Sequence, residues 1–208
     1  MMTRICSLLL AATAVFGQFK VQPAGDPPTE AAAPVLAAMN KAGSKIVANS
    51  GSTIVEVWLR STMPSGPNTG ESSVSLPTIP PGAMLGIVRF PAKGSDRRGQ
   101  TIAPGVYTVR YGNYPVNGNH QGVAPQRDFL LLVPAALDKS VDPISDFDAL
   151  LDLSRKASGT AHPGVLSFWK ADADQKPGFE KQGEKDWVLS TKLGDTLVSI
   201  ILIGKAED

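Results

Sequence analysis

Cysteine and histidine are almost absent from this 208-residue chain. The one cysteine is Cys6, and the two histidines are His120 and His162. A single cysteine excludes a disulfide within the chain, so the fold must rely on its hydrophobic core. Two imidazoles leave few positions for a metal ligand or a catalytic base.

Long apolar runs are also missing, because a helix that spans a bilayer needs about 20 apolar residues. The N-terminal run, residues 5–15, has about 11 and follows Arg4. Small or slim side chains at Val15 and Gly17 then precede Gln18, which is typical of a cleaved secretory signal peptide. We therefore predict export by the general secretory route to the periplasm or the extracellular space. The mature chain would contain no cysteine and no transmembrane segment.

The sequence also lacks an excess of positive or of negative charge. Arg4 is the only charged residue of segment 1–17, so the mature chain would carry 19 of the 20 basic residues against 19 acidic ones. A neutral protein has no electrostatic footprint for nucleic acid or for an anionic membrane surface. We therefore expect no nucleic-acid partner, and a small molecule or an envelope protein in its place.

Several catalytic motifs are absent from the sequence. It contains no G-x-S-x-G, H-E-x-x-H or G-x-G-x-x-G pattern. Residues 94–101 have the glycine spacing of a phosphate-binding loop, but Gln100 replaces the lysine that would contact the phosphates. These absences argue against an enzyme, although a hydrolase would need only one histidine and one acid in the right positions.

The chain is instead rich in short apolar segments separated by glycine and proline, of which there are 20 and 17. This spacing predicts strands rather than disorder. The predicted strands cover residues 45–47, 53–60, 84–90, 106–114, 127–133, 165–170, 187–192 and 196–204. The stretch 138–158 contains the main predicted helix, capped by Ser145 and ended by Gly159, and residues 34–42 predict a short one.

The patterning of the strands indicates the architecture. Tyr107, Val109 and Tyr111 alternate with Thr108 and Arg110, which is typical of a strand with one face in the core. Strands do not alternate with long helices and no repeat is present, which disfavours parallel sheets and solenoids. We predict a mostly β fold, an antiparallel two-sheet β-sandwich of about eight strands with one surface helix. It would occupy residues 35–208 as a single domain, after a signal peptide at 1–17 and a flexible tether at 18–34.

The most unusual polar segment is 118–128, which joins a glycine-rich loop to a predicted central strand. Asp128 shares a strand face with Leu130 and Leu132, so we expect it to point inward. A buried carboxylate is costly without a partner, and Arg110 or Arg89 is the expected one. A structural ion pair and a ligand-binding cluster are both open. The candidate ligand-binding residues are His120, Arg127, Asp128, Arg110 and His162.

A metal site is a second hypothesis for this region. His120 and His162 both lie in loops next to predicted core strands and could meet at one end of the fold. With Asp128 they could ligate zinc or copper, whereas loop histidines otherwise hydrogen-bond or face solvent. No other cofactor is expected. The tyrosines and tryptophans could form a stacking platform for sugars, although strand aromatics are more often core residues.

Three segments resemble a family of exported bacterial proteins with no known activity. They are residues 105–111 (GVYTVRY), 118–120 (GNH) and 124–132 (APQRDFLLL). The resemblance implies export and a β-sandwich fold, and it brings no catalytic residue. The sequence thus favours an exported, non-enzymatic β-sandwich that binds a ligand or has a structural role at the cell envelope. A metal-binding module is the second hypothesis, and a secreted hydrolase is the third.

Overall fold

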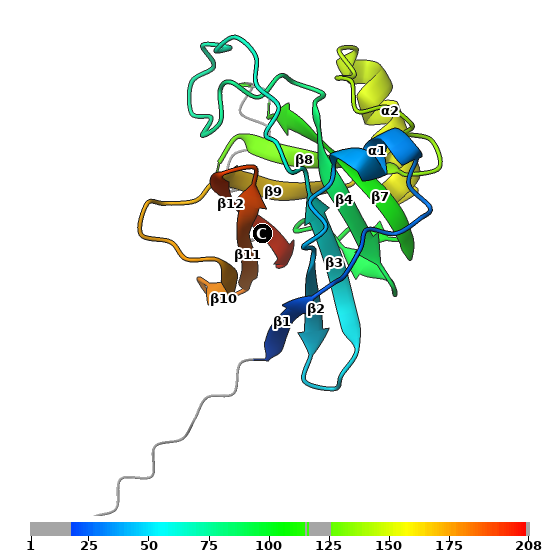
Figure 1. Cartoon of the computed structure of the whole chain (residues 1–208), viewed down its shortest axis with the longest axis vertical. Helices are drawn as coiled ribbons and strands as arrows, with labels where there is room; N and C mark the ends of the chain where they lie inside the picture. The colour runs from blue at the N-terminus through cyan, green and yellow to red at the C-terminus, as the bar shows by residue number, and fades with distance from the viewer. Residues whose placement is uncertain (1–17, 115, 117–125, 207–208) are drawn as a thin grey trace, which may run out of the picture.

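A computed structural model describes residues 18–114, 116 and 126–206, and it shows a mostly β protein built from antiparallel strands (Figure 1). The predicted signal peptide, residues 1–17, lies outside the described residues. The strands are β1 (Phe19–Pro23), β2 (Ser44–Ala48), β3 (Thr53–Leu59), β4 (Met84–Phe90), β5 (Gly94–Ser95), β6 (Thr101–Ile102), β7 (Gly105–Asn113), β8 (Asp128–Pro134), β9 (Val165–Lys170), β10 (Gly178–Gln182), β11 (Asp186–Leu193) and β12 (Thr196–Ile203). The helices are α1 (Ala33–Ala38) and α2 (Phe147–Ser158), and neither is long and apolar enough to cross a membrane.

All eight predicted strands are present, as β2, β3, β4, β7, β8, β9, β11 and β12. The strands that the sequence did not predict are β1, β5, β6 and β10. Each of these has only two to five residues, and none shows a sustained apolar alternation. Such short segments become strands because a neighbouring strand offers them a hydrogen-bonding edge, which local propensity does not reveal.

Ten strands form one sheet in the order β1-β2-β3-β4-β7-β8-β9-β12-β11-β10, and β5 pairs separately with β6. The sheet coils until its end strands, β1 and β10, lie next to each other, so it forms a nearly closed barrel (Figure 1). This single coiled sheet replaces the predicted two-sheet sandwich of about eight strands. Alternation along a strand shows that it has two faces, but it does not show which strands pair, and the pairing decides between a sandwich and a barrel.

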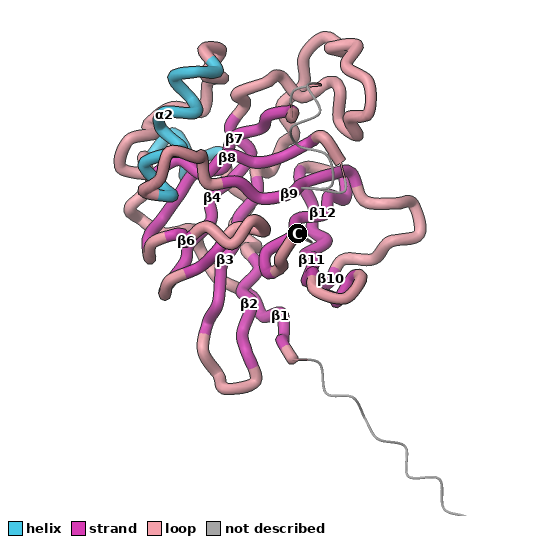
Figure 2. The backbone as a smooth tube through the Cα atoms, turned by 180° about the vertical axis from the view of Figure 1, so that it is seen from behind, coloured by secondary structure: helices cyan, strands magenta, loops and turns pink. Residues whose placement is uncertain are grey.

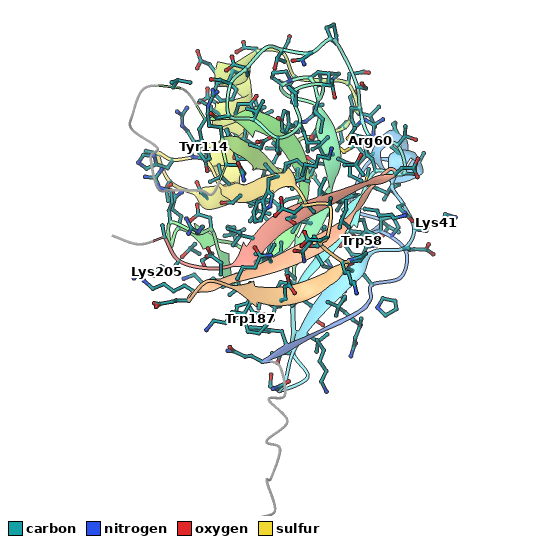
Figure 3. The ribbon with its side chains drawn as sticks, turned by 90° about the vertical axis from the view of Figure 1, so that its left-hand side faces the viewer. Lys41, Trp58, Arg60, Tyr114, Trp187 and Lys205 are labelled. Atoms are coloured by element: carbon teal, nitrogen blue, oxygen red, sulfur yellow. The ribbon has the colours of Figure 1, made fainter. Side chains whose placement is uncertain are left out.

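Aromatic side chains hold the two ends of the sheet together. Within the described residues, β1 and β10 share no hydrogen-bonded ladder. The ring of Phe19 on β1 instead packs edge-on against Phe179 on β10, with centroids 5.9 Å apart, and against Trp187 on β11 at 4.8 Å. Phe179 and Trp187 stack on each other at 5.6 Å. Figure 3 labels Trp187 at this closure, beside the start of β1.

This closure gives a first testable prediction. We expect Phe19→Ala to lower the free energy of unfolding by about 1–2 kcal/mol, because it removes two edge-to-face ring contacts. It should also speed hydrogen exchange of the β2 amides, since β1 covers that edge. Val21→Ala is the matched control on the same strand, because Val21 is 42% exposed and lies outside the ring cluster. Equal effects of the two variants would show that the rings do not hold β1.

The predicted faces of the central strands are confirmed by their packing. The apolar face of β7 points into the barrel, where it joins the main core cluster through Tyr107, Val109 and Tyr111. Strand β8 is covered on both sides, as its apolar sequence predicted. Its inner face adds Leu130 and Leu132 to the same core. Its outer face packs beneath α2 through Phe129, Leu131 and Val133.

Helix α2 lies on the outer surface of the barrel, against β8 (Figure 2). Its N-cap is Asp146 rather than the predicted Ser145, because the Asp146 carboxylate accepts the amide of Ala149 at 3.1 Å. A carboxylate there also suits the positive end of the helix. Gly159 ends the helix in the left-handed conformation, at φ 67°, as predicted.

The segment predicted as a flexible tether, residues 18–34, is instead part of the fold. Strand β1 pairs with β2 along its whole length. Trp58, on the outer face of β3, donates from Nε1 to the carbonyl of Gly25 at 2.8 Å (Figure 3). Val35 of α1 and Met39, which follows α1, belong to the same buried cluster as Trp58. A buried indole needs an acceptor for its N–H group, so this proline-rich segment is held in place by a distant strand.

Candidate functional site

Asp128 is fully buried at the start of β8 and points inward, as predicted. Its carboxylate accepts the amides of Ser75 at 2.8 Å and Leu76 at 3.2 Å, and the hydroxyl of Tyr111 at 2.8 Å. The prediction that Arg110 or Arg89 pairs with it is wrong. Three neutral donors satisfy the carboxylate instead, and they attach the segment before residue 77 to the end of the barrel.

Arg110 is used entirely in a structural contact on the outer face of β7. Its guanidinium forms a bidentate pair with Asp138, with both N–O distances 2.7 Å. Its remaining donors reach the carbonyls of Gly82, Ser140 and Asp142 at 2.7 to 2.8 Å. All five N–H groups of the side chain are therefore bonded, and Arg110 is only 1% exposed. This residue fastens the segment around 138–142 to the sheet and presents no free donor to a ligand.

The other two arginines singled out near this region are also engaged. Arg89 pairs with the buried carboxylate of Glu56. Arg127 donates to the carbonyls of Tyr114 at 2.8 Å and Ser72 at 2.5 Å, and pairs with Glu71 at 3.0 Å. Asp128 and Arg127 thus hold the same loop, 71–76, from neighbouring chain positions.

Of the two histidines, the structure describes His162. His120 lies outside the described residues. His162 is exposed, and its backbone amide donates to the hydroxyl of Thr160 at 3.1 Å. No group of three or more His, Cys, Asp or Glu side chains that could hold a metal occurs in the described part of the chain. The zinc or copper site of His120, His162 and Asp128 stays a prediction.

A pocket lies beside His162, between α2 and the outer face of the sheet. We call it the α2 pocket, and its volume is about 160 Å³. It is lined by Arg98, Tyr114, Phe129, Phe147, Leu151, His162, Pro163 and Val165. Most of these side chains are aromatic or aliphatic. The two that carry polar nitrogen atoms, Arg98 and His162, come from loops at the rim of the pocket. Small-molecule sites commonly combine a largely apolar lining with a few polar groups in this way.

The floor of the α2 pocket is a pair of stacked rings. Tyr114 and Phe129 have centroids 4.4 Å apart and an interplanar angle of 28°. Both are buried, at 8% and 3% exposure, whereas Phe147 on the first turn of α2 is 39% exposed. Burial raises the pKa of Tyr114 to about 12, and nearby Arg98 acts against that rise. The Tyr114 hydroxyl is therefore neutral at physiological pH.

The rim is a hydrogen-bonded unit made from two loops. The turn between β5 and β6 is closed by Asp96, whose carboxylate accepts the amides of Arg98 at 3.0 Å and Gln100 at 2.9 Å. The side chain of Gln100 then reaches the second loop, donating to the carbonyl of Pro163 at 3.2 Å and accepting the Thr160 hydroxyl at 2.7 Å. Figure 2 shows α2 and β6 on the same side of the molecule. The loops that carry Arg98 and His162 are thus joined before any ligand binds.

Two further hollows are larger but more open. One, of about 620 Å³, lies around Arg89, Pro91 and Pro104. The other, of about 390 Å³, lies at the end of the barrel near Phe19, Lys93 and the β5–β6 hairpin. The α2 pocket is the more enclosed of these sites, and it contains a residue that the sequence had marked, His162.

Comparisons with protein-family models, with curated proteins and with solved structures gave no match to this chain. The resemblance drawn from residues 105–132 therefore stays a prediction, and the assignment of function rests on the geometry of the site.

Sequence reasoning missed most of this pocket. Residues 94–101 were considered for phosphate binding and rejected, yet they form the turn that carries Arg98 and Gln100. Phe147 and Leu151 were assigned to a helix, and their contribution to a pocket depends on the strand beneath them. The tyrosines and tryptophans are not gathered on one surface: Tyr107, Tyr111, Trp58, Tyr114 and Trp169 are divided among four core clusters, and Trp187 packs against Phe19 and Phe179.

Proposed function

We propose that this protein is an exported, non-enzymatic binding protein and that the α2 pocket is its ligand site. The observation that carries the proposal is the stacked floor of Tyr114 and Phe129 beneath an exposed apolar wall from α2. An exposed Phe147 beside such a floor leaves apolar surface in water, and a ligand that covers it would be stabilised. Export is supported by the signal-like composition of residues 1–17.

The size of the α2 pocket limits its ligand. An apolar cavity of about 150 Å³ accepts a molecule the size of benzene, and the α2 pocket has about 160 Å³. The ligand, or the part of it that enters, is therefore one ring or a short branched chain. For so few atoms, a dissociation constant of about 0.1–1 mM is the expected range.

Blocking the pocket tests the proposal. We expect benzene to bind the purified protein, with saturable chemical-shift changes in NMR spectra, and Leu151→Trp to remove this binding because the larger side chain fills the site. Lys156→Trp is the matched control, since Lys156 is exposed on the same helix and does not line the pocket. Melting temperatures would establish that both variants fold.

Binding that is equally strong in the two variants would place the ligand elsewhere and contradict the proposal. Absence of saturable binding by benzene and by the other single-ring probes named below would contradict it as well.

A further inference from the structure

The polar groups at the rim of the α2 pocket have one kind of charge. Arg98 is a permanent cation, and the imidazole of His162 can donate a hydrogen bond. Among the described residues that line the pocket there is no aspartate or glutamate. Its polar edge is therefore complementary to an anion, whereas its floor is complementary to an aromatic ring.

Asp96, the acidic residue two positions before Arg98, is already hydrogen-bonded within its own turn. The Asp96 carboxylate is 1% exposed and accepts the amides of Arg98 and Gln100, and the Gln100 side-chain amide at 2.8 Å. None of these donors is the guanidinium of Arg98, and that side chain is exposed. In the part of the chain that the structure describes, no salt bridge involves Arg98.

The rim is also pre-organised, which lowers the entropy that binding costs. Gln100 links the turn of Arg98 to the loop of His162 through Pro163 and Thr160. The cationic rim and the aromatic floor belong to one small pocket, since Arg98, Tyr114 and Phe129 all line it. A ligand that joins an anion directly to one ring fits both parts.

We propose that the α2 pocket binds a small aromatic carboxylate, with the ring over Tyr114 and Phe129 and the carboxylate at Arg98. A guanidinium pairs with a carboxylate through two parallel hydrogen bonds, which gives direction as well as charge. This assignment rests on the proposed function, because it names the chemical class of ligand for the same pocket.

Benzoate and benzamide test this assignment, since they have the same shape and differ in charge. We expect benzoate to bind the full-length protein about ten-fold more tightly than benzamide, as one charge-assisted bidentate contact allows. Arg98→Gln should remove that preference and leave benzamide binding unchanged. Lys176→Gln is the matched control, because Lys176 is an exposed cation far from the pocket lining.

The outcomes separate the two proposals. Equal binding of benzoate and benzamide, both blocked by Leu151→Trp, would overturn the carboxylate assignment and leave the binding function standing. Failure of both probes and of benzene would overturn both proposals. Inorganic phosphate competing with benzoate at equal concentration would also overturn the assignment, because it would show an anion site that makes no use of the aromatic floor.

Discussion

Asp138→Ala should lower the free energy of unfolding by about 3–5 kcal/mol, because it leaves a buried guanidinium without its counter-charge. Arg110 and Asp138 are 1% and 4% exposed, and the two N–O distances of their bidentate pair are 2.7 Å. The hydroxyl of Thr108 donates to the same carboxylate and would lose its partner too. Urea denaturation followed by tryptophan fluorescence measures the change.

Asp152→Ala is the matched control for this prediction. Asp152 also pairs with an arginine, Arg155, but its side chain is 69% exposed and that of Arg155 is 41% exposed. Exposed pairs of this kind contribute about 0–1 kcal/mol, so the control should change stability little. Arg110→Lys should be nearly as destabilising as Asp138→Ala, because an ammonium cannot reach the carboxylate and the three carbonyls together. A loss under about 1 kcal/mol for Asp138→Ala would contradict the assignment of Arg110 as a structural clamp.

Asp128→Ala should also destabilise the protein by about 3 kcal/mol or more, although no ion pair is broken. The substitution leaves the amides of Ser75 and Leu76 and the Tyr111 hydroxyl without their acceptor, and each buried unsatisfied donor costs about 1–3 kcal/mol. Tyr111→Phe removes only one of these bonds and should cost about 1 kcal/mol. Equilibrium unfolding of the two variants and of the double mutant gives their coupling.

A matched control for Asp128 is Asp174→Ala, because Asp174 is exposed in a loop. A second readout separates the role of the loop from that of the core. Loss of the Asp128 contacts should release the segment before residue 77, so the amides of Ser75 and Leu76 should exchange faster even where the barrel stays folded. Unchanged exchange at these two amides would contradict the role given to Asp128.

The outer and inner faces of the sheet thus use different means to hold loops. On the outside of β7, a fully bonded arginine holds the segment near residue 138. On the inside of β8, a buried carboxylate that accepts three hydrogen bonds holds the segment near residue 75. Both residues were candidate ligand contacts in the sequence because they are charged and next to core strands. The structure shows both charged groups bonded to other parts of the protein, Arg110 through all five of its N–H groups and Asp128 through three hydrogen bonds.

The positions and faces of the long strands could be predicted from the sequence because the signal is local. Alternation over residues 105–113 of β7 shows which side chains turn inward, and glycine and proline mark where each strand ends. The burial of Asp128 followed from the same alternation, and Gly159 was recognisable as a helix end because few other residues adopt its conformation. These features depend on residues a few positions apart.

The partners of those residues depended on the tertiary structure. Asp128 bonds an amide 53 positions away, Arg110 pairs with a residue 28 positions away, and Gln100 joins a hydroxyl 60 positions away. No local pattern selects among several arginines and carboxylates at such separations, because the choice is made by strand order and loop packing. The barrel closure through Phe19 and the α2 pocket arise in the same way, from surfaces that meet only after ten strands have paired into one coiled sheet.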